Sequence, residues 1–118
     1  MMDEVIVVGG PAPVSFERLR ERIAAYLAGT AVERAVVFGS WARGEQDASS
    51  DLDLVLVEET ASPFVERGRT HMPLFGMGVG IDLIVYTPGE YERLLDGGHP
   101  FVTRVAGEGV VIYARSGG

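Results

Sequence analysis

Short apolar runs separated by polar or glycine-rich segments follow one another along the chain. Runs of four to eight residues that are rich in valine and isoleucine and bounded by turn-forming residues are typical of buried β-strands. The second such run ends abruptly at Gly39-Ser40, and a polar segment separates it from the third. The segments with this pattern are residues 5–8, 32–38, 52–57, 79–86 and 110–113.

Other segments predict helices. Between Ser15, a residue type that caps helix starts, and Gly29, a common stop, apolar residues recur every three or four positions. Proline following a capping residue predicts further helices that start at residues 62–63, 87–88 and 99–100.

The sequence also indicates where two of these helices end and how far the domain extends. Pro73 must end or kink the helix that starts at 62–63, and the helix from 99–100 is expected to run through Val105. We expect one domain over residues 1–118, with an extension at 1–13, a core at 14–113 and a frayed tail at 114–118.

Composition allows a sizeable core and indicates a reducing compartment. The chain has 118 residues, of which 47% are hydrophobic, and no cysteine, so disulfides and thiolate metal sites are excluded. The acidic start with its short apolar run is neither a signal peptide nor a membrane span. We therefore expect a cytoplasmic protein without membrane contact.

Charge argues against long nucleic acid as a partner. The net charge is −7, and the ten basic residues, all arginine, form no cluster of the kind that binds polyanions. The absence of lysine removes the Walker A phosphate loop and any lysine-linked intermediate. A single mononucleotide that carries its own Mg²⁺ remains compatible with this charge.

Three aspartates interrupt otherwise apolar strands. Asp51 and Asp53 point the same way because side chains alternate along a strand, and Asp82 lies within the next predicted strand. Each alone would be a strand-end cap or an ion-pair partner, but three together are unfavourable unless cations lie between them. Carboxylate oxygens suit Mg²⁺, and two such ions ~3.5–4 Å apart can promote in-line phosphoryl transfer. On this hypothesis Asp51 and Asp53 bridge two ions, and Asp82 completes the ion that binds the attacking hydroxyl.

The turn after the second run offers groups for a phosphate. Gly39 permits close approach of backbone N–H groups, Ser40 adds a hydroxyl donor, and Arg43 could contact a phosphate oxygen. Arg43 could equally be a solvated residue paired with Glu45 or Asp47. Trp41 could stack on a base or, as the simpler interpretation, cover a sheet edge.

These residues carry a family resemblance. The segments Gly39-Ser40-x-x-Arg43-Gly44, Ser50-Asp51-Leu52-Asp53-Leu54 and Ile81-Asp82-Leu83-Ile84 resemble the DNA polymerase β-type nucleotidyltransferases, within them the minimal nucleotidyltransferases that pair with HEPN-domain proteins. The resemblance implies an α+β fold, a small mixed β-sheet flanked by helices.

The resemblance also implies a function. It implies two Mg²⁺ ions at Asp51, Asp53 and Asp82, nucleotide contacts from Gly39, Ser40, Arg43 and Ser50, and transfer of AMP from ATP. In toxin–antitoxin pairs the acceptor is a tyrosine of the HEPN protein, which makes this chain the antitoxin. Residues 1–13 and 70–80 depart from the family pattern, so the acceptor is less constrained than the metal chemistry. The base preference and the oligomeric state, including a homo-oligomer, are left open.

Two other functions compete with this one. The same chemistry could act on a small-molecule hydroxyl, as in aminoglycoside-modifying enzymes, although these carry an additional helical domain that this sequence lacks. A non-catalytic module could instead neutralise a partner by contact. His71 is interpreted as a loop residue and His99 as a neighbour of a helix cap, neither with a catalytic role, because Mg²⁺ sites need no imidazole.

Overall fold

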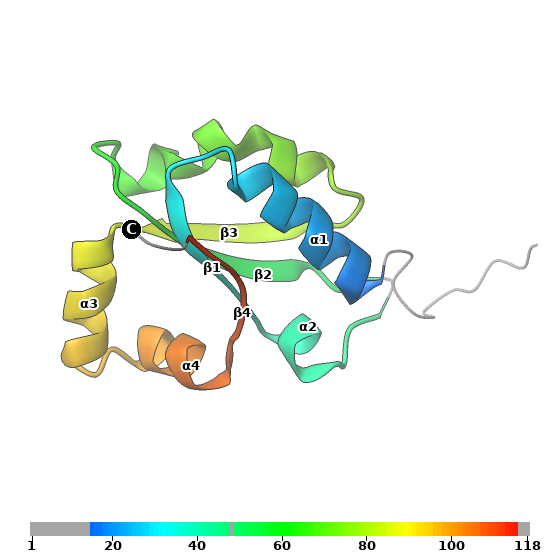
Figure 1. Cartoon of the computed structure of the whole chain (residues 1–118). Helices are drawn as coiled ribbons and strands as arrows, with labels where there is room; N and C mark the ends of the chain where they lie inside the picture. Colours follow the sequence, from blue (N-terminus) through cyan, green and yellow to red (C-terminus); the bar gives the residue numbers. More distant parts are fainter. Residues whose placement is uncertain (1–14, 48, 116–118) are drawn as a thin grey trace, which may run out of the picture.

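One mixed sheet organises the computed structural model, which describes residues 15–47 and 49–115. Its strand order is β3-β2-β1-β4, with β1 antiparallel to β2 and β4, and β2 parallel to β3 (Figure 1). The sheet and its flanking helices confirm the predicted α+β class. In chain order the elements are α1 (Phe16–Leu27), β1 (Val32–Phe38), α2 (Ser40–Arg43), β2 (Leu52–Glu58), the 3₁₀ segment η1 (Phe64–Gly76), β3 (Ile81–Tyr86), α3 (Pro88–Asp96), α4 (Pro100–Glu108) and β4 (Val110–Ala114).

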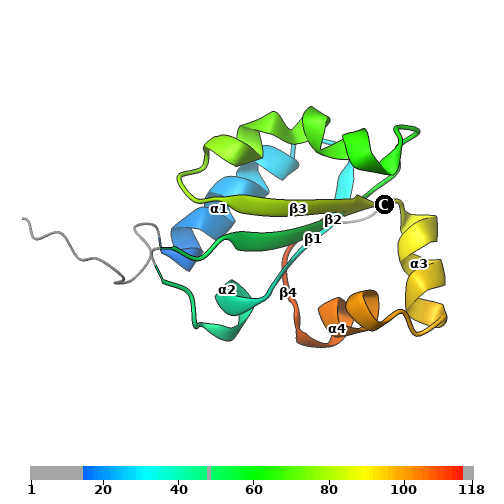
Figure 2. The same cartoon turned by 180° about the vertical axis from the view of Figure 1, so that it is seen from behind.

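Helices cover both faces of the sheet. In Figures 1 and 2, α1 and η1 lie on one side, here called the first face, and α3 and α4 lie on the other, the second face. Alternation along β2 supplies both layers. Leu54 belongs to the apolar cluster that contains Leu19 of α1. Val55 belongs to a separate cluster with Tyr91 of α3 and Val102 of α4. Strand β2 therefore packs apolar side chains on both faces of the sheet, as its continuous apolar sequence predicts.

The predicted first helix forms as its sequence indicates. The hydroxyl oxygen of Ser15 accepts a hydrogen bond from the backbone N–H of Arg18 at 3.2 Å, which caps the helix start. Leu19, Ile23 and Leu27 are completely buried on one side of α1. The 3.6-residue period thus places the helix on the first face.

The two C-terminal helices also begin at their predicted caps. The Thr87 hydroxyl accepts from the Glu90 N–H at 3.1 Å while the Glu90 carboxylate accepts from the Thr87 N–H at 2.9 Å, a reciprocal capping box. His99 is itself the cap of α4, because its Nδ1 accepts from the Val102 N–H at 3.4 Å. The helix continues to Glu108, beyond its predicted end, because no glycine in a left-handed conformation or proline stops it earlier.

The segment between β2 and β3 is helical but irregular. Its predicted start after Ser62-Pro63 is confirmed, and η1 consists of two 3₁₀ helices that join across a kink. The non-helical residue is His71 (φ −119°, ψ 34°), two positions before Pro73, which lies inside the segment. The predicted break is therefore present, although displaced from the proline.

His71 is buried, so its interpretation as a loop residue is wrong. Its side chain is 2% exposed and lies between α1 and β2. The Tyr26 hydroxyl lies 2.7 Å from Nδ1, and a Glu58 carboxylate oxygen lies 2.7 Å from Nε2. One ring nitrogen can thus donate to Glu58 while the other accepts from Tyr26, which satisfies both. The weak apolar periodicity of η1 gave no indication that His71 would be buried and bonded to Tyr26 and Glu58.

Replacing His71 with alanine is expected to lower the free energy of unfolding by about 2–4 kcal/mol, because it leaves a cavity and an unpaired Glu58 carboxylate. Chemical denaturation measures this loss. Met72→Ala is the matched control, since Met72 is 62% exposed and should change stability by less than about 0.5 kcal/mol. Equal effects of the two substitutions would refute the anchoring role.

The C-terminal end of the described chain belongs to the sheet. Strand β4 reaches Ala114, and the Arg115 N–H donates to the Glu33 carbonyl at 2.8 Å, so the predicted frayed tail does not begin at 114. The whole predicted extension at 1–13, which includes the predicted strand at 5–8, and residues 116–118 lie outside the described residues. Within those residues, no helix has the length and apolar character needed to cross a membrane.

Candidate active site

Asp53 and Asp82 are direct neighbours across the parallel pair β2–β3. Both carboxylates lie on the second face, in line with Val55 and Ile84, which belong to the apolar layer under α3 and α4. The aspartate end of this face is open: Asp82 is exposed and Asp53 is half-buried. Asp51, just before β2, is exposed as well. The fold therefore gathers the three predicted aspartates at one accessible edge of the sheet.

Asp53 shows how crowded these carboxylates are. Its pKa lies above the usual value, first because of burial, then because of a hydrogen bond with Asp82 and the negative charges of Asp82 and Asp51. The positive charge of Arg43 opposes these effects. A cation between these carboxylates would relieve the same repulsion.

Gly39 fits against the central carboxylate. It adopts φ 77° and ψ −152°, a conformation that L side chains rarely take, directly after β1. A Cβ at this position would overlap the Asp53 carboxylate. The sequence predicts that Gly39 admits a phosphate. In the structure, Gly39 also makes room for the Asp53 carboxylate. Ser40 follows as the first residue of α2 and is half-buried.

Arg43 has the ion pair that the alternative interpretation anticipated. Its Nε donates to the Glu45 carboxylate at 2.9 Å, and both side chains are more than half exposed. This hydrogen bond and the charge of Glu45 raise the pKa of Arg43, with further contributions from Glu108 and Asp53. Arg43 therefore lies within electrostatic reach of the aspartates. The proximity of Glu108, from the end of α4, could not be foreseen from sequence spacing.

The polar loop before β2 is internally hydrogen-bonded. The Ser50 hydroxyl oxygen accepts from the Asp47 N–H at 2.9 Å and donates to the Asp47 carboxylate at 3.3 Å. The Trp41 Nε1–H donates to the Ser50 carbonyl at 3.4 Å. Trp41 is 1% exposed and packs edge-on against Phe16, so it covers the sheet end and cannot stack on a base.

The donor set of the site suits a hard divalent cation. Among residues 15–47 and 49–115, no three side chains of the metal-binding types are already arranged closely enough to hold an ion. The oxygen-only chemistry of Asp51, Asp53 and Asp82, and the raised pKa of Asp53 that their charges help to cause, nevertheless fit Mg²⁺. Asp53 and Asp82 are the closest pair by register.

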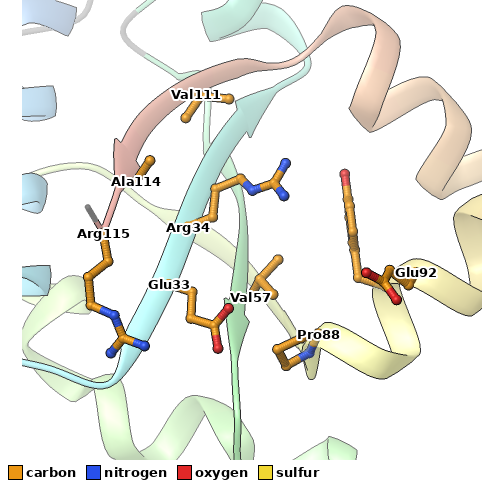
Figure 3. A pocket seen from close by; sticks show the side chains of 9 residues that line it. Glu33, Arg34, Val57, Pro88, Glu92, Val111, Ala114 and Arg115 are labelled. Atoms are coloured by element: carbon orange, nitrogen blue, oxygen red, sulfur yellow. The ribbon is translucent and has the colours of Figure 1, made fainter. Parts of the chain in front are cut away.

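A cavity of about 550 Å³ lies elsewhere, between β1, β4 and α3 (Figure 3). Arg34 projects into it and lies over the Tyr91 ring, with its Cζ 5.7 Å from the ring centroid. None of the predicted site residues lines this cavity. The predicted site residues therefore lie outside this cavity.

Comparison with known proteins places this geometry in a family. The sequence matches the family described as polymerase beta, nucleotidyltransferase over residues 21–117. A solved structure described as a minimal nucleotidyltransferase is 31% identical, with a TM-score of 0.60 over 83% of this chain and 96% of that one. A nucleotidyltransferase from Sulfolobus solfataricus is 24% identical, with a TM-score of 0.59 over 86% of this chain and 82% of that one. No curated protein matches the chain.

A third solved structure adds a likeness of fold. It is a toxin-antitoxin complex with AMP-PNP, 16% identical, with a TM-score of 0.59 over 82% of this chain and 74% of that one. The family match spans most of the sequence and includes the turn at 39–40 and all three aspartates. It confirms the family that the sequence motifs indicated. The chain belongs to the polymerase beta nucleotidyltransferase family.

Proposed function

We propose that the chain is an Mg²⁺-dependent nucleotidyltransferase that moves AMP from ATP to a hydroxyl of a partner protein. The partner we propose is the HEPN-domain toxin of a toxin–antitoxin pair. The observation that carries the proposal is the pairing of Asp53 with Asp82 on an open sheet face, beside the turn at Gly39.

The residues of the site divide the reaction between them. Asp51, Asp53 and Asp82 would hold two Mg²⁺ ions, which supply charge stabilisation for an in-line displacement at phosphorus. The acceptor oxygen bonds to the α-phosphorus of ATP, the bond from that phosphorus to the β-phosphate bridging oxygen breaks, and pyrophosphate leaves. Asp82, which is more accessible than Asp53, would receive the hydroxyl proton.

The turn after β1 supplies the nucleotide contacts in this proposal. Backbone N–H groups at Gly39 and Ser40 would contact the triphosphate, and the glycine would permit its close approach. Arg43 would exchange its exposed pair with Glu45 for a phosphate oxygen, and little stability would be lost because solvent screens exposed ion pairs. Ser50 would support the site indirectly, because its hydrogen bond with the Asp47 N–H closes the loop before β2.

Two observations favour a protein as the acceptor. A toxin-antitoxin complex with AMP-PNP shares the fold. In addition, η1 exposes large apolar side chains, which commonly mark protein contacts. These residues are Phe64, Val65, Met72 and Phe75, between 44% and 86% exposed.

The test is transfer of label from ATP to the product of the neighbouring gene in the presence of Mg²⁺. We expect that protein to gain one AMP, as seen by intact-mass measurement, and Asp53→Ala to abolish the gain. Label that appears on a small molecule instead would favour the aminoglycoside type of acceptor. Neutralisation of the partner by the Asp53→Ala protein without any label would favour a module that acts by contact.

A further inference from the structure

Gly80, the residue before β3, lies against the carboxylate of Asp51. The Leu52 N–H donates to the Gly80 carbonyl at 2.8 Å, which holds the entries of β2 and β3 together. A Cβ on Gly80 would overlap Oδ1 of Asp51 and lie 3.1 Å from its carboxyl carbon. The carboxylate therefore occupies the volume that a side chain at position 80 would fill.

This relation repeats the one at the other glycine of the site. Gly39 leaves room for the Asp53 carboxylate, and Gly80 leaves room for that of Asp51. The neighbouring glycines differ: Gly78 has a positive φ of 96°, and a Cβ on Gly76 would meet no atom within 4 Å. A Cβ would therefore meet an aspartate at Gly80 but not at Gly76.

We propose that Gly80 is a positioning residue that fixes the Asp51 carboxylate beside Asp53 for binding of a divalent cation. The proposal rests on the proposed function for the nature of the ligand. Its steric basis is independent of that function. Because the φ of Gly80 lies outside the left-handed region, alanine at this position would be opposed by the carboxylate rather than by the backbone.

Gly80→Ala should weaken cation binding without unfolding the protein. The exposed Asp51 side chain can rotate into solvent, so the melting temperature should stay close to that of the parent. Mutation of a residue that orients a metal ligand typically lowers metal affinity 10–100-fold. We expect Gly80→Ala to lower the affinity for Mn²⁺ about tenfold, as measured by electron paramagnetic resonance. Gly76→Ala is the matched control and should bind Mn²⁺ like the parent.

A double-mutant cycle makes the test specific to Asp51. In an Asp51→Ala background the clash is absent, so adding Gly80→Ala should change Mn²⁺ affinity by less than about twofold. The proposal is overturned if Gly80→Ala binds as the parent does, if it weakens binding equally in the Asp51→Ala background, or if Gly76→Ala has the same effect. A parent protein that binds no Mn²⁺ overturns it as well.

The outcome is separable from that of the transfer assay. If the chain transfers no nucleotide but the cycle gives the expected coupling, the proposed function fails and the role of Gly80 stands. If transfer occurs and the coupling is absent, the role of Gly80 fails alone.

Discussion

Asp53→Asn is expected to abolish nucleotide transfer and leave the protein folded. Asp53 is the carboxylate that the other two aspartates and Gly39 surround, so its loss should cost several kcal/mol of charge stabilisation at the transferring phosphoryl group. This corresponds to a fall in kcat/KM on the order of 10³-fold. An amide can donate to Asp82, whereas a carboxylate repels it, so the free energy of unfolding should be unchanged or slightly higher. Transfer kinetics and chemical denaturation measure the two effects.

Glu59→Gln controls for the loss of one negative charge. Glu59 is exposed just beyond the opposite end of β2, and its neutralisation should leave kcat/KM within about twofold of the parent. An Asp53→Asn protein that retained a tenth of parental activity would contradict the assigned role. Loss of activity with loss of folding would make Asp53 a structural residue.

Arg67→Ala is expected to cause a large loss of stability. Arg67 is 7% exposed and joins three elements. Its guanidinium donates to both oxygens of Glu90 and, at 3.0 Å, to the Val85 carbonyl, while its Nε donates to the Ser62 carbonyl at 2.9 Å. Truncation leaves the buried Val85 carbonyl and the partly buried Ser62 and Glu90 acceptors unpaired, for a predicted loss of about 3 kcal/mol in the free energy of unfolding. Arg67→Lys should recover only part of it, because an ammonium group cannot make the bidentate pair.

This ion pair also predicts an acid dependence. Hydrogen bonds from Arg67 and the Thr87 backbone lower the pKa of Glu90 from 4.5 to about 2. A carboxylate with a lowered pKa contributes stability above its unfolded-state pKa, and the contribution is lost as pH falls toward the folded-state value. Stability should therefore decline between about pH 4.5 and pH 2, and less steeply in Arg67→Ala.

Arg69→Ala serves as the control for both effects of Arg67. Arg69 belongs to the same segment and is exposed, so its loss should change stability by less than about 0.5 kcal/mol at either pH. Parallel pH profiles for the two alanine variants would show that the Arg67–Glu90 pair does not anchor η1.

Local patterns predicted much of this fold. The caps at Ser15 and Thr87 and the period of apolar residues in α1 depend on near neighbours in the chain, and they formed as expected. The interior of η1 was not predictable in this way. Its stability depends on Arg67 and His71, whose partners lie in β2, α1 and α3. Polar contacts between residues so far apart in sequence leave no periodic signal.

The candidate site, too, was predictable only in part from local sequence patterns. The period of two along a strand puts Asp51 and Asp53 together, and the place of Asp82 inside the next apolar run marks it as the third carboxylate. The register that sets Asp82 beside Asp53 depends on the parallel pairing of β2 with β3, which spacing alone does not determine. The roles of glycine are clearer in three dimensions: residues 76–80 contain three glycines, and only the backbone path shows which of them faces a carboxylate.

Crystals grown with Mn²⁺ and AMP-PNP would test the central claim most directly, by anomalous difference density from the metal. We predict a Mn²⁺ peak between Asp53 and Asp82, with the phosphates of the nucleotide beside Gly39. Nucleotide bound in the cavity near Arg34 and Tyr91, with no peak at the aspartates, would contradict the account.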